Sequence, residues 1–413
     1  MKVLTNPLRE LVELPPETRA SMGIEYTPKE IESQPKVWIK NFELLRDRED
    51  EIRSFIESKI LRKKYVRVIL SGAGTSGFIG LSVENLLRKR WCRDVEARPT
   101  TDIVTSWDSI FLRDVETTVI SFARSGNSPE SVGTILLANK FLDRVNHIVV
   151  TCNRHGKLAK MVEGGENVLL LVTPDEANDK GLAMTSSFTT MTSTAQFLAY
   201  IQDVDKYERI IKSMSEAAES LIEEYSSLLR EISNLNFKRA FFLGSGALYG
   251  CAVESSLKLQ EMTSGKVICK SDTFMGFRHG PEVAVDDNSL IVFYVSTDSF
   301  TRKYEIDLIE DIYTKNLGLV KIAICDKSIK EIAEYVDHVI EFNPEGDLDI
   351  PDSCRPMLDV IVAQTLALFK SLNLGLKPDN PSESGVITRV VKGVKIYDYE
   401  KFKKDGTFKV VAE

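Results

Sequence analysis

The chain has 413 residues, of which 43% are hydrophobic and 28% are charged, a composition that excludes wholesale disorder and predicts more than one folded domain. Its 53 basic and 61 acidic residues give a net charge of −8, which argues against a broad surface for nucleic acid or anionic lipid. The six cysteines and four histidines show no metal-ligand spacing, and no apolar run is long enough to cross a bilayer, so we expect no metal site and no membrane association.

Residues 1–60 are expected to form an N-terminal helical arm, because they show no strand-like alternation. Thr27 followed by Pro28, with Glu30 in the first turn, is a typical helix start. The mixed-charge run at 46–53 has helical spacing and predicts a solvent-exposed helix face.

Short apolar runs alternate with helix-length segments through residues 61–204, which we predict to be the first α/β domain. The strand-like runs are 66–70, 118–122, 147–152 and 168–172, and a long helical pattern follows at 185–201. This alternation predicts a doubly wound, mainly parallel sheet with helices on both faces, a three-layer αβα arrangement.

A charged, helix-prone linker at 205–235 precedes a second domain of the same texture at 236–376. Its strand-like runs are 240–243, 290–295, 319–325 and 338–342, and its last helix is expected at about 355–371. The glycine loops of the two domains begin at Gly72 and Gly244, 172 residues apart, which predicts two copies of one α/β unit. Residues 377–413 remain as a C-terminal tail, which we expect to close the functional site, with a strand-like segment at 394–397.

The first glycine loop, Gly72-x-Gly74-x-x-Gly77, follows a strand and precedes a helix, as in dinucleotide-binding folds. Asp94 or Asp102 lies at a distance along the chain that suits a ribose-binding acid, so a dinucleotide site stays open. The hydroxyls of Thr75 and Ser76 inside the loop favour a compact phosphate group instead.

A second polar loop follows the next strand of the same domain. It contains Arg124, Ser125 and Ser128, and Pro129 lies where a helix can begin. Because neighbouring strand ends of a doubly wound sheet face one crevice, we expect the two loops to bind one phosphomonoester between them. A simple capped turn is the alternative for Ser125–Ser128, and Arg124 would contact the phosphate, the sugar or solvent.

The second domain carries candidate chemistry rather than a second phosphate site. Its glycine loop lacks the Thr-Ser pair, which suggests that phosphate binding has been lost there. Lys258 and Glu261 share one helix face, a spacing that more often indicates a surface ion pair than a catalytic one. His279, between Arg278 and a Gly-Pro turn, is a candidate for proton transfer, although a lone histidine is usually structural.

These motifs together resemble the sugar isomerase (SIS) family with two tandem domains. The chain is similar to the isomerase portion of glucosamine-6-phosphate synthase and, much more closely, to galactosamine-6-phosphate deaminase/tagatose-6-phosphate ketose–aldose isomerase proteins. The resemblance covers almost the whole chain and includes Glu30-Ile31, Gly72–Gly77, Arg124–Ser131, Asn178–Phe188, Ser271–Pro281 and Arg389–Tyr397.

The resemblance implies a set of site residues. Those implied to hold the sugar phosphate or line its site are Gly74, Thr75, Ser76, Arg124, Ser125, Ser128 and Leu182. Arg124 stands where the synthase has a glutamine, and Ala123 where it has a serine. The implied catalytic residues are Glu261 for proton transfer between C1 and C2, His279 for ring opening, and Lys258 and Lys392 near the open-chain sugar.

The implied function is an aldose–ketose isomerase and deaminase that acts on a 2-amino-2-deoxyhexose 6-phosphate, namely galactosamine-6-phosphate. It would release tagatose-6-phosphate and ammonia without a cofactor or metal. In the synthase the ring-opening histidine comes from a neighbouring subunit, which implies a homodimer or larger homo-oligomer with shared active sites. We expect a cytoplasmic protein with no nucleic-acid partner.

Three alternatives remain at this point. The first is a phospho-sugar isomerase that releases no ammonia, and the second is a non-catalytic sugar-phosphate regulator. The four candidate catalytic residues argue against a regulator, as does the lack of a basic extension. The third alternative is a dehydrogenase, which the glycine loop alone would allow.

Overall fold

The computed structural model describes residues 6–382, 384–391 and 393–413, and it contains two five-stranded parallel sheets of the same topology. The first sheet has the order β2-β1-β3-β4-β5 and the second β10-β9-β8-β6-β7. Written from its other edge, the second order is β7-β6-β8-β9-β10, so each strand takes the place of the strand numbered five lower in the first sheet. The predicted α/β class, with two copies of one unit, is therefore confirmed.

The first unit is built on β1 (Arg67–Ser71), β2 (Asp94–Ala97), β3 (Thr117–Ala123), β4 (Val145–Thr151) and β5 (Val168–Val172). Its helices are α6 (Thr75–Trp91), α7 (Thr100–Ile110), α8 (Pro129–Phe141), α9 (Lys157–Val162) and α10 (Ser186–Ala199), with the short 3-10 helix η2 (Asp175–Ala177). Side chains alternate between the two faces of the sheet. Val68 and Leu70 face a core shared with α6 and α10, whereas Ile69 packs toward α7 and α8. The three layers follow from this alternation.

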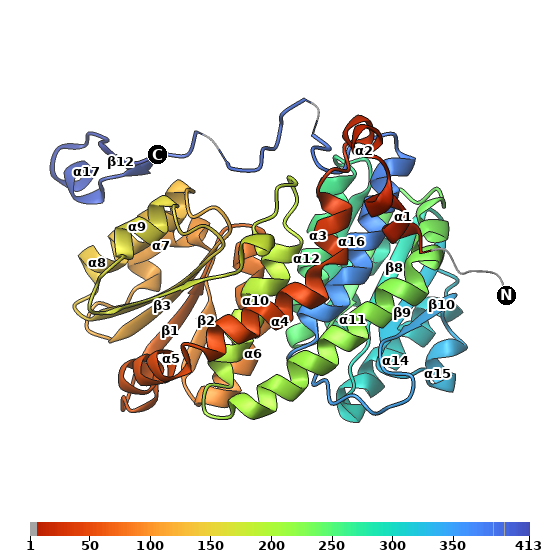
Figure 1. The fold of residues 1–413 in the computed structure, drawn as a ribbon, viewed down its shortest axis with the longest axis horizontal. Helices are drawn as coiled ribbons and strands as arrows, with labels where there is room; N and C mark the ends of the chain where they lie inside the picture. Colours follow the sequence, from red (N-terminus) through yellow and green to blue (C-terminus); the bar gives the residue numbers. More distant parts are fainter. Residues whose placement is uncertain (1–5, 383, 392) are drawn as a thin grey trace.

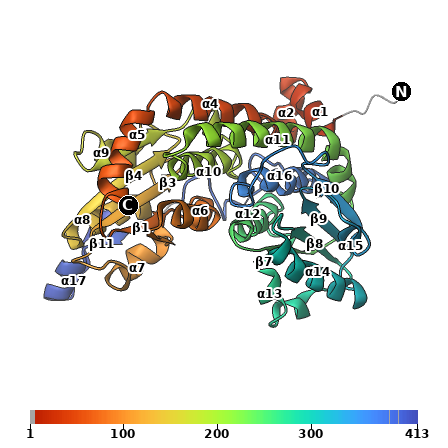
Figure 2. The same ribbon diagram turned by 90° about the horizontal axis from the view of Figure 1, so that it is seen from below.

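The second unit is built on β6 (Arg239–Gly244), β7 (Ile268–Asp272), β8 (Ser289–Tyr294), β9 (Val320–Cys325) and β10 (His338–Glu341). Its helices are α12 (Ala247–Met262), α13 (Phe274–Phe277), α14 (Ser299–Thr314), α15 (Lys330–Ala333) and α16 (Pro356–Asn373), with the 3-10 helix η3 (Pro281–Ala284). The inner faces of both sheets belong to one continuous hydrophobic core, in which α6, α10, α12 and α16 lie between the sheets. The two units are thus packed through their helices (Figure 2).

The N-terminal arm consists of α1 (Pro7–Glu13), α2 (Pro16–Met22), α3 (Thr27–Glu32), α4 (Gln34–Arg46) and α5 (Glu49–Ile56), followed by the π-helical turn η1 (Glu57–Leu61). Helix α4 and the long α11 (Val204–Ser233) run side by side across both units (Figures 1 and 2). Helix α3 begins at Thr27 itself, one residue earlier than expected. Its Thr27 hydroxyl donates to Asp379 instead of capping the helix.

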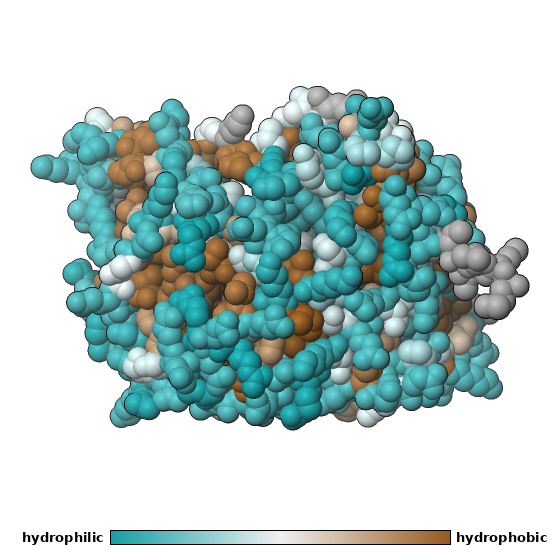
Figure 3. All heavy atoms as spheres, in the orientation of Figure 1, coloured by the Kyte–Doolittle hydropathy of each residue, from teal (hydrophilic) through white to brown (hydrophobic). Residues whose placement is uncertain are grey.

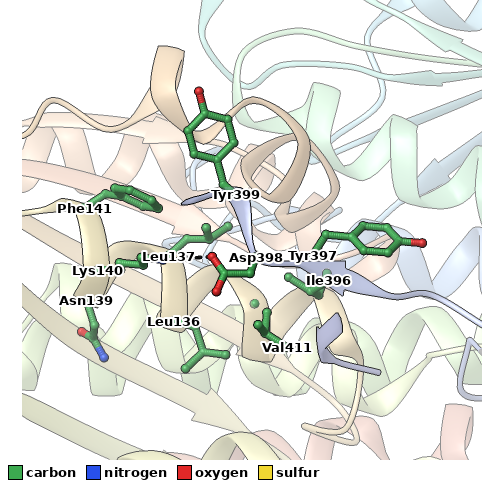
Figure 4. Close-up of a pocket in the computed structure, with 11 residues that line it drawn as sticks. Leu136, Leu137, Asn139, Lys140, Phe141, Ile396, Tyr397, Asp398, Tyr399 and Val411 are labelled. Atoms are coloured by element: carbon green, nitrogen blue, oxygen red, sulfur yellow. Dashed lines mark hydrogen bonds and ion pairs between the residues drawn. The ribbon is translucent and has the colours of Figure 1, made fainter. Parts of the chain in front are cut away.

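The C-terminal tail returns from the end of α16 to the first unit, where it forms β11 (Ile396–Tyr397), α17 (Tyr399–Asp405) and β12 (Val410–Ala412) (Figure 1). This terminal module packs on α8, with Ile396 and Tyr399 beside Leu137 and Phe141 around a pocket of about 370 Å³ (Figure 4). Asp398 pairs with Lys140 on α8 at 3.2 Å. Residues 384–391, between α16 and β11, are here called the strap.

The face of the molecule in Figure 3 is mostly hydrophilic, with smaller hydrophobic patches. In the part of the chain that the structure describes, no helix is both long and apolar enough to span a membrane.

Candidate active site

Two helix N-termini meet at the carboxyl edge of the first sheet, where β1 and β3 are neighbours. The loop after β1 turns at Gly74, whose φ of +54° favours glycine, and α6 begins at the next residue. The loop after β3 turns at Gly126, with a φ of +62°, and α8 begins at Pro129. Amide groups at such helix ends favour anions. The predicted convergence of the two loops is therefore present in the structure.

Three of the predicted phosphate-binding hydroxyls line one small pocket of about 100 Å³, here called the serine pocket. Ser76 reaches it from the first turn of α6, and Ser125 and Ser128 reach it from the loop before α8. The Ser128 hydroxyl lies 2.8 Å from that of Ser131, which lines the same pocket. The residues Arg389, Val390 and Val391 of the strap also line it.

A larger pocket of about 560 Å³, here called the lysine pocket, adjoins the serine pocket. The predicted residues that line it are Gly74, Thr75, Arg124, Leu182, Lys258 and Glu261. Arg124, Met184 and Arg389 line both pockets. The structure thus places the predicted Lys-Glu pair next to the serine pocket, and it places Thr75 in the lysine pocket instead of the serine pocket.

Lys258 is fully buried, which excludes the surface ion pair that its spacing suggested. Its Nζ lies 2.5 Å from Oε2 of Glu261 and donates a 3.1 Å hydrogen bond to the Thr75 hydroxyl. The Glu261 side chain keeps 22% of its surface exposed, so it can contact a molecule in the pocket. Helix α12 presents Lys258 and Glu261 on one face because they are three residues apart.

Glu254, one turn before Lys258, is a site residue that the sequence analysis missed. It is fully buried, its Oε1 lies 3.4 Å from Lys258 Nζ, and it accepts a hydrogen bond from the Thr75 hydroxyl. Burial raises the pKa of Glu254 to about 8. For Lys258, burial opposes the charge, but Glu254 and Glu261 outweigh it and raise the pKa. The spacing of four residues from Lys258 was the available signal.

Arg124 is buried, and its guanidinium binds backbone carbonyls. Nη1 donates to the carbonyl oxygens of Gly181, at 3.3 Å, and Leu182, at 3.0 Å. Nη2 donates to the carbonyl oxygen of Arg389 in the strap at 2.8 Å. Arg124 therefore links Leu182 and Arg389, which both line the lysine pocket, to the loop between β3 and α8.

The loop that carries Leu182 is stabilised by hydrogen bonds to its own Asp179, to the N-terminal arm and to the C-terminal tail. The Asp179 carboxylate accepts the amides of Thr185, at 2.9 Å, and Ser186, at 3.0 Å, at the start of α10. The Glu30 carboxylate from the N-terminal arm accepts the Gly181 amide at 3.3 Å. Burial, with the Asp179 charge, raises the pKa of Glu30 to about 8.

The tail completes this support. The amide of Leu182 donates to the carbonyl oxygen of Asp379 at 2.9 Å. Arg389 Nε donates to the carbonyl oxygen of Asp179 at 2.9 Å, and its Nη2 donates to Asn178 Oδ1. The arm and the tail, which are far apart in sequence, thus set the position of one pocket wall.

Two predicted catalytic residues are not in this cluster. His279 is exposed in the turn between α13 and η3 and lines neither the serine pocket nor the lysine pocket. Helix α13 lies on the second unit, away from the first sheet (Figure 2). Lys392 lies outside the described residues.

The corresponding crevice of the second unit holds a carboxylate of the protein itself. Asp352 accepts the Thr297 amide at 3.0 Å and the Thr297 hydroxyl at 2.9 Å, and it pairs with Arg355 at 2.8 Å. Glu305 accepts the Ser296 amide at 2.7 Å. An internal anion takes the donors that a phosphate would need, which gives a physical reason for the predicted loss of phosphate binding.

A dinucleotide site that uses Asp94 does not fit this geometry. Asp94 is at the amino end of β2, paired in register with Arg67, so it lies at the opposite edge of the sheet from the glycine loop. At the carboxyl end of β2, where a ribose-binding acid is needed, the next residue is Arg98. Among the described residues, no group of three or more histidine, cysteine, aspartate or glutamate side chains is arranged to hold a metal ion.

Comparison with known proteins shows the family to which the chain is similar. The family model described as SIS domain matches residues 60–201 and 235–370. The D-galactosamine-6-phosphate deaminase AgaS of Escherichia coli is 36% identical to this chain over 376 residues, which are 91% of this chain and 96% of that protein. A glutamine–fructose-6-phosphate aminotransferase of Pyrobaculum aerophilum is a more distant relative, 26% identical over 76% of this chain and 50% of that protein.

Solved structures extend the likeness to the whole fold. The tagatose-6-phosphate ketose/aldose isomerase of Escherichia coli matches with a TM-score of 0.83 and 34% identity, over 91% of this chain and 96% of that one. A protein of Clostridium novyi NT, provisionally described as the same kind of isomerase, matches with a TM-score of 0.90 and 36% identity, over 94% and 99% of the two chains. The predicted resemblance is confirmed.

Proposed function

The chain belongs to the SIS domain family, and from this premise we propose that it is a sugar-phosphate isomerase that also deaminates its substrate. The substrate would be a 2-amino-2-deoxyhexose 6-phosphate, namely galactosamine-6-phosphate, and the products tagatose-6-phosphate and ammonia. The observation that carries the proposal is the Lys258–Glu261 pair, 2.5 Å apart, in a pocket that adjoins the serine pocket. A relative at 36% identity is named for this deamination.

The serine pocket would hold the 6-phosphate. Ser76, Ser125 and Ser128 supply hydroxyls, and the N-termini of α6 and α8 supply amides. Such a site needs no broad positive surface, so it is compatible with the net charge of −8. With the phosphate there, the sugar carbons would extend into the lysine pocket.

Glu261 would transfer the proton in the open-chain sugar. Its carboxylate removes the C2 proton, and the electron pair forms the C1–C2 double bond of an enolamine while O1 takes a proton from water. Glu261 then returns its proton to C1, the nitrogen electron pair forms an iminium at C2, and loss of the nitrogen proton to the hydroxide gives the imine. Water adds to C2, ammonia leaves, and the ketose phosphate remains. These steps use side chains and water, without a redox change.

Lys258 would stabilise the charge that develops on the sugar oxygens. It is buried between two carboxylates, which hold it in the charged form. A buried cation acts more strongly on nearby charge than an exposed one does. Glu254 would position Lys258, since it lies 3.4 Å away and is fully buried.

Ring opening would need a group from outside this cluster. His279 is exposed, so it is free to enter the pocket of a second copy of the chain. We propose a homodimer, or a larger homo-oligomer, in which His279 of one protomer serves the site of its partner. Lys392, next to the strap, would contribute a second cation near the open-chain sugar, and a cytoplasmic location suits a phosphorylated metabolite.

The second candidate is an isomerase that releases no ammonia, which the likeness to an Escherichia coli protein named for ketose–aldose isomerisation favours. A panel of phosphorylated hexosamines and hexoses, with ammonia and ketose phosphate both measured, separates the two. Ammonia from galactosamine-6-phosphate supports the deaminase. Isomerised product with no ammonia from any hexosamine phosphate supports the second candidate, and no turnover of any sugar supports a regulator.

A further inference from the structure

Two arginines meet at the boundary between the serine pocket and the lysine pocket, and both line both pockets. Arg124 lies on the loop after β3, and Arg389 is part of the strap. They are joined directly, because Arg124 Nη2 donates to the carbonyl oxygen of Arg389 at 2.8 Å. We refer to the two residues as the arginine clasp.

Neither guanidinium of the clasp forms an ion pair with a carboxylate in the described part of the chain. Arg124 donates to three backbone carbonyls, and Arg389 donates to one backbone carbonyl and one side-chain amide oxygen. Arg355, which is fully buried in the second unit, shows the contrast, since it pairs with both Asp352 and Asp359.

A buried charge without a contact ion pair is unfavourable, and the Asp179 and Glu261 carboxylates act on Arg124 only from beyond ion-pair distance, so the site gains from an anion that contacts it directly. A guanidinium has five N–H groups, and the three carbonyl bonds of Arg124 leave two of them for another acceptor. Burial lowers the pKa of Arg124, which a neighbouring dianion would reverse.

The strap also forms part of the serine pocket itself, through Arg389, Val390 and Val391. Ser76, Ser125 and Ser128 lie on the first unit, so the pocket is complete only when the strap is in place. The strap is exposed along most of its length, and the Arg124 bond to Arg389 and the Arg389 bonds to residues 178–179 fasten it there.

We propose that Arg124 and Arg389 are phosphate-binding residues that make closure of the strap depend on the 6-phosphate of the substrate. This inference rests on the proposed function for the identity of the phosphate ester. The dianion binds between the serine hydroxyls and the clasp, supplies an anion in direct contact with the guanidinium groups, and draws Arg389 and the strap onto the first unit. Sugars without a phosphate leave the strap free to open, so they meet an incomplete lysine pocket.

The test uses inorganic phosphate as the probe and requires no turnover. In the wild-type protein, phosphate should slow hydrogen exchange of the amides in residues 384–391, and titration calorimetry should detect its binding. Arg389→Gln should weaken phosphate binding at least about tenfold, because a charged hydrogen bond is lost, and should abolish the exchange protection. Arg389→Lys should restore part of the affinity because it restores the charge.

Arg124→Gln should give the same loss, and Arg113→Gln is the matched control, since Arg113 is exposed and pairs only with Asp143 among the described residues. Arg124 is buried, so its variant is informative only if it folds, but Arg389 is half-buried and the wild-type exchange measurement needs no variant. Unchanged strap exchange in wild-type protein with saturating phosphate would overturn the proposal. Wild-type phosphate affinity in both Arg389 variants would overturn it as well.

Kinetics separate this inference from the proposed function. With galactosamine-6-phosphate, Arg389→Gln should raise KM at least about tenfold and lower kcat. Added inorganic phosphate should stimulate turnover of galactosamine by the wild type and not by Arg389→Gln. If the wild-type protein binds phosphate and protects the strap amides but releases no ammonia, the proposed function is wrong, whereas the inference about Arg124 and Arg389 is supported.

Discussion

At the scale of single residues, access and charge distinguish the two carboxylates that flank Lys258. Glu254 is fully buried with a raised pKa of about 8, whereas 22% of the Glu261 side chain is exposed at the lysine pocket. A base that removes a proton from carbon has to touch the substrate. Glu261 is therefore assigned the proton transfer, and Glu254 is assigned the positioning of Lys258.

Glu261→Gln should lower kcat by about 10²–10⁴-fold, the range that a general base contributes. Substrate affinity should be preserved, because glutamine has the same size and the serine pocket is untouched. Ammonia release gives kcat, and titration with galactosamine-6-phosphate gives the affinity. Glu331→Gln, at an exposed position on α15, is the matched control. Wild-type kcat in Glu261→Gln would refute the assignment.

Glu254→Gln tests the positioning role through the pH profile. The Glu254 charge helps to raise the pKa of Lys258, so its removal should lower that pKa. The alkaline limb of kcat against pH should then move to lower pH, while the acidic limb stays in place. A profile that only falls in height, without a shift, would show a structural role alone.

Glu30→Gln should flatten the dependence of stability on pH. The pKa of Glu30 is raised from 4.5 to about 8 in the folded protein, chiefly by burial, so the folded state retains a proton that the unfolded state releases. The contribution of Glu30 to the free energy of unfolding is fully present below about pH 4.5 and is lost as the pH rises toward about 8. The melting temperature of the wild type should fall more between pH 5 and pH 8 than that of Glu30→Gln.

Residue types and spacing located Lys258, Glu261 and the serines, because each lies on a helix or at a helix start whose position the sequence indicates. The roles of Arg124 and Glu30 could not be predicted in this way. Their partners, Arg389 and Gly181, lie 265 and 151 residues away along the chain, and nothing in the local pattern encodes these contacts.

At the scale of elements, the alternation of short apolar runs and helices identified eight of the ten strands of the two parallel sheets. The two that it missed, β2 and β7, occupy equivalent edge positions in the two units. Each has one side without a neighbouring strand, and β7 has no fully buried residue, so a hydrophobic run is absent. Edge strands of this kind are set by pairing with β1 or β6 rather than by their own composition.

The terminal module anchors the far end of the strap on α8. Ile396 is buried there, and its side-chain carbons come within about 3.0 Å of the position that a Cβ on Gly133 would take. Ile396→Ala should cost about 2–5 kcal/mol of docking free energy and expose the strap to trypsin. Val410→Ala, at an exposed position of the same module, is the control. Equal cleavage rates for the two variants would show that Ile396 does not anchor the module.

At the scale of the whole molecule, one unit supplies the serine pocket and the other supplies Lys258 and Glu261. The two units share one fold, but in the second unit Asp352 occupies the crevice that corresponds to the serine pocket. The second unit can therefore contribute side chains to the lysine pocket without a phosphate site of its own. His279 is exposed and lines neither pocket, so its proposed contribution to the site of a second protomer needs a test of its own.

Sharing of the site can be tested by complementation. Glu261→Gln and His279→Gln should each be inactive alone, and co-refolding of the two should restore activity in mixed dimers. With random pairing about a quarter of the sites contain both native residues, so about a quarter of the wild-type activity is expected. Activity no greater than that of the separate variants would indicate that His279 acts within its own chain or not at all.

The central claim is that Glu261 moves a proton within an amino-sugar phosphate and that ammonia leaves in the same turnover. A time course of ammonia and tagatose-6-phosphate from galactosamine-6-phosphate tests it most directly, with Glu261→Gln in parallel. The two products should appear in equal amounts with the wild type, and both should disappear with the variant. Ketose phosphate without ammonia, or equal rates for the two proteins, would contradict it.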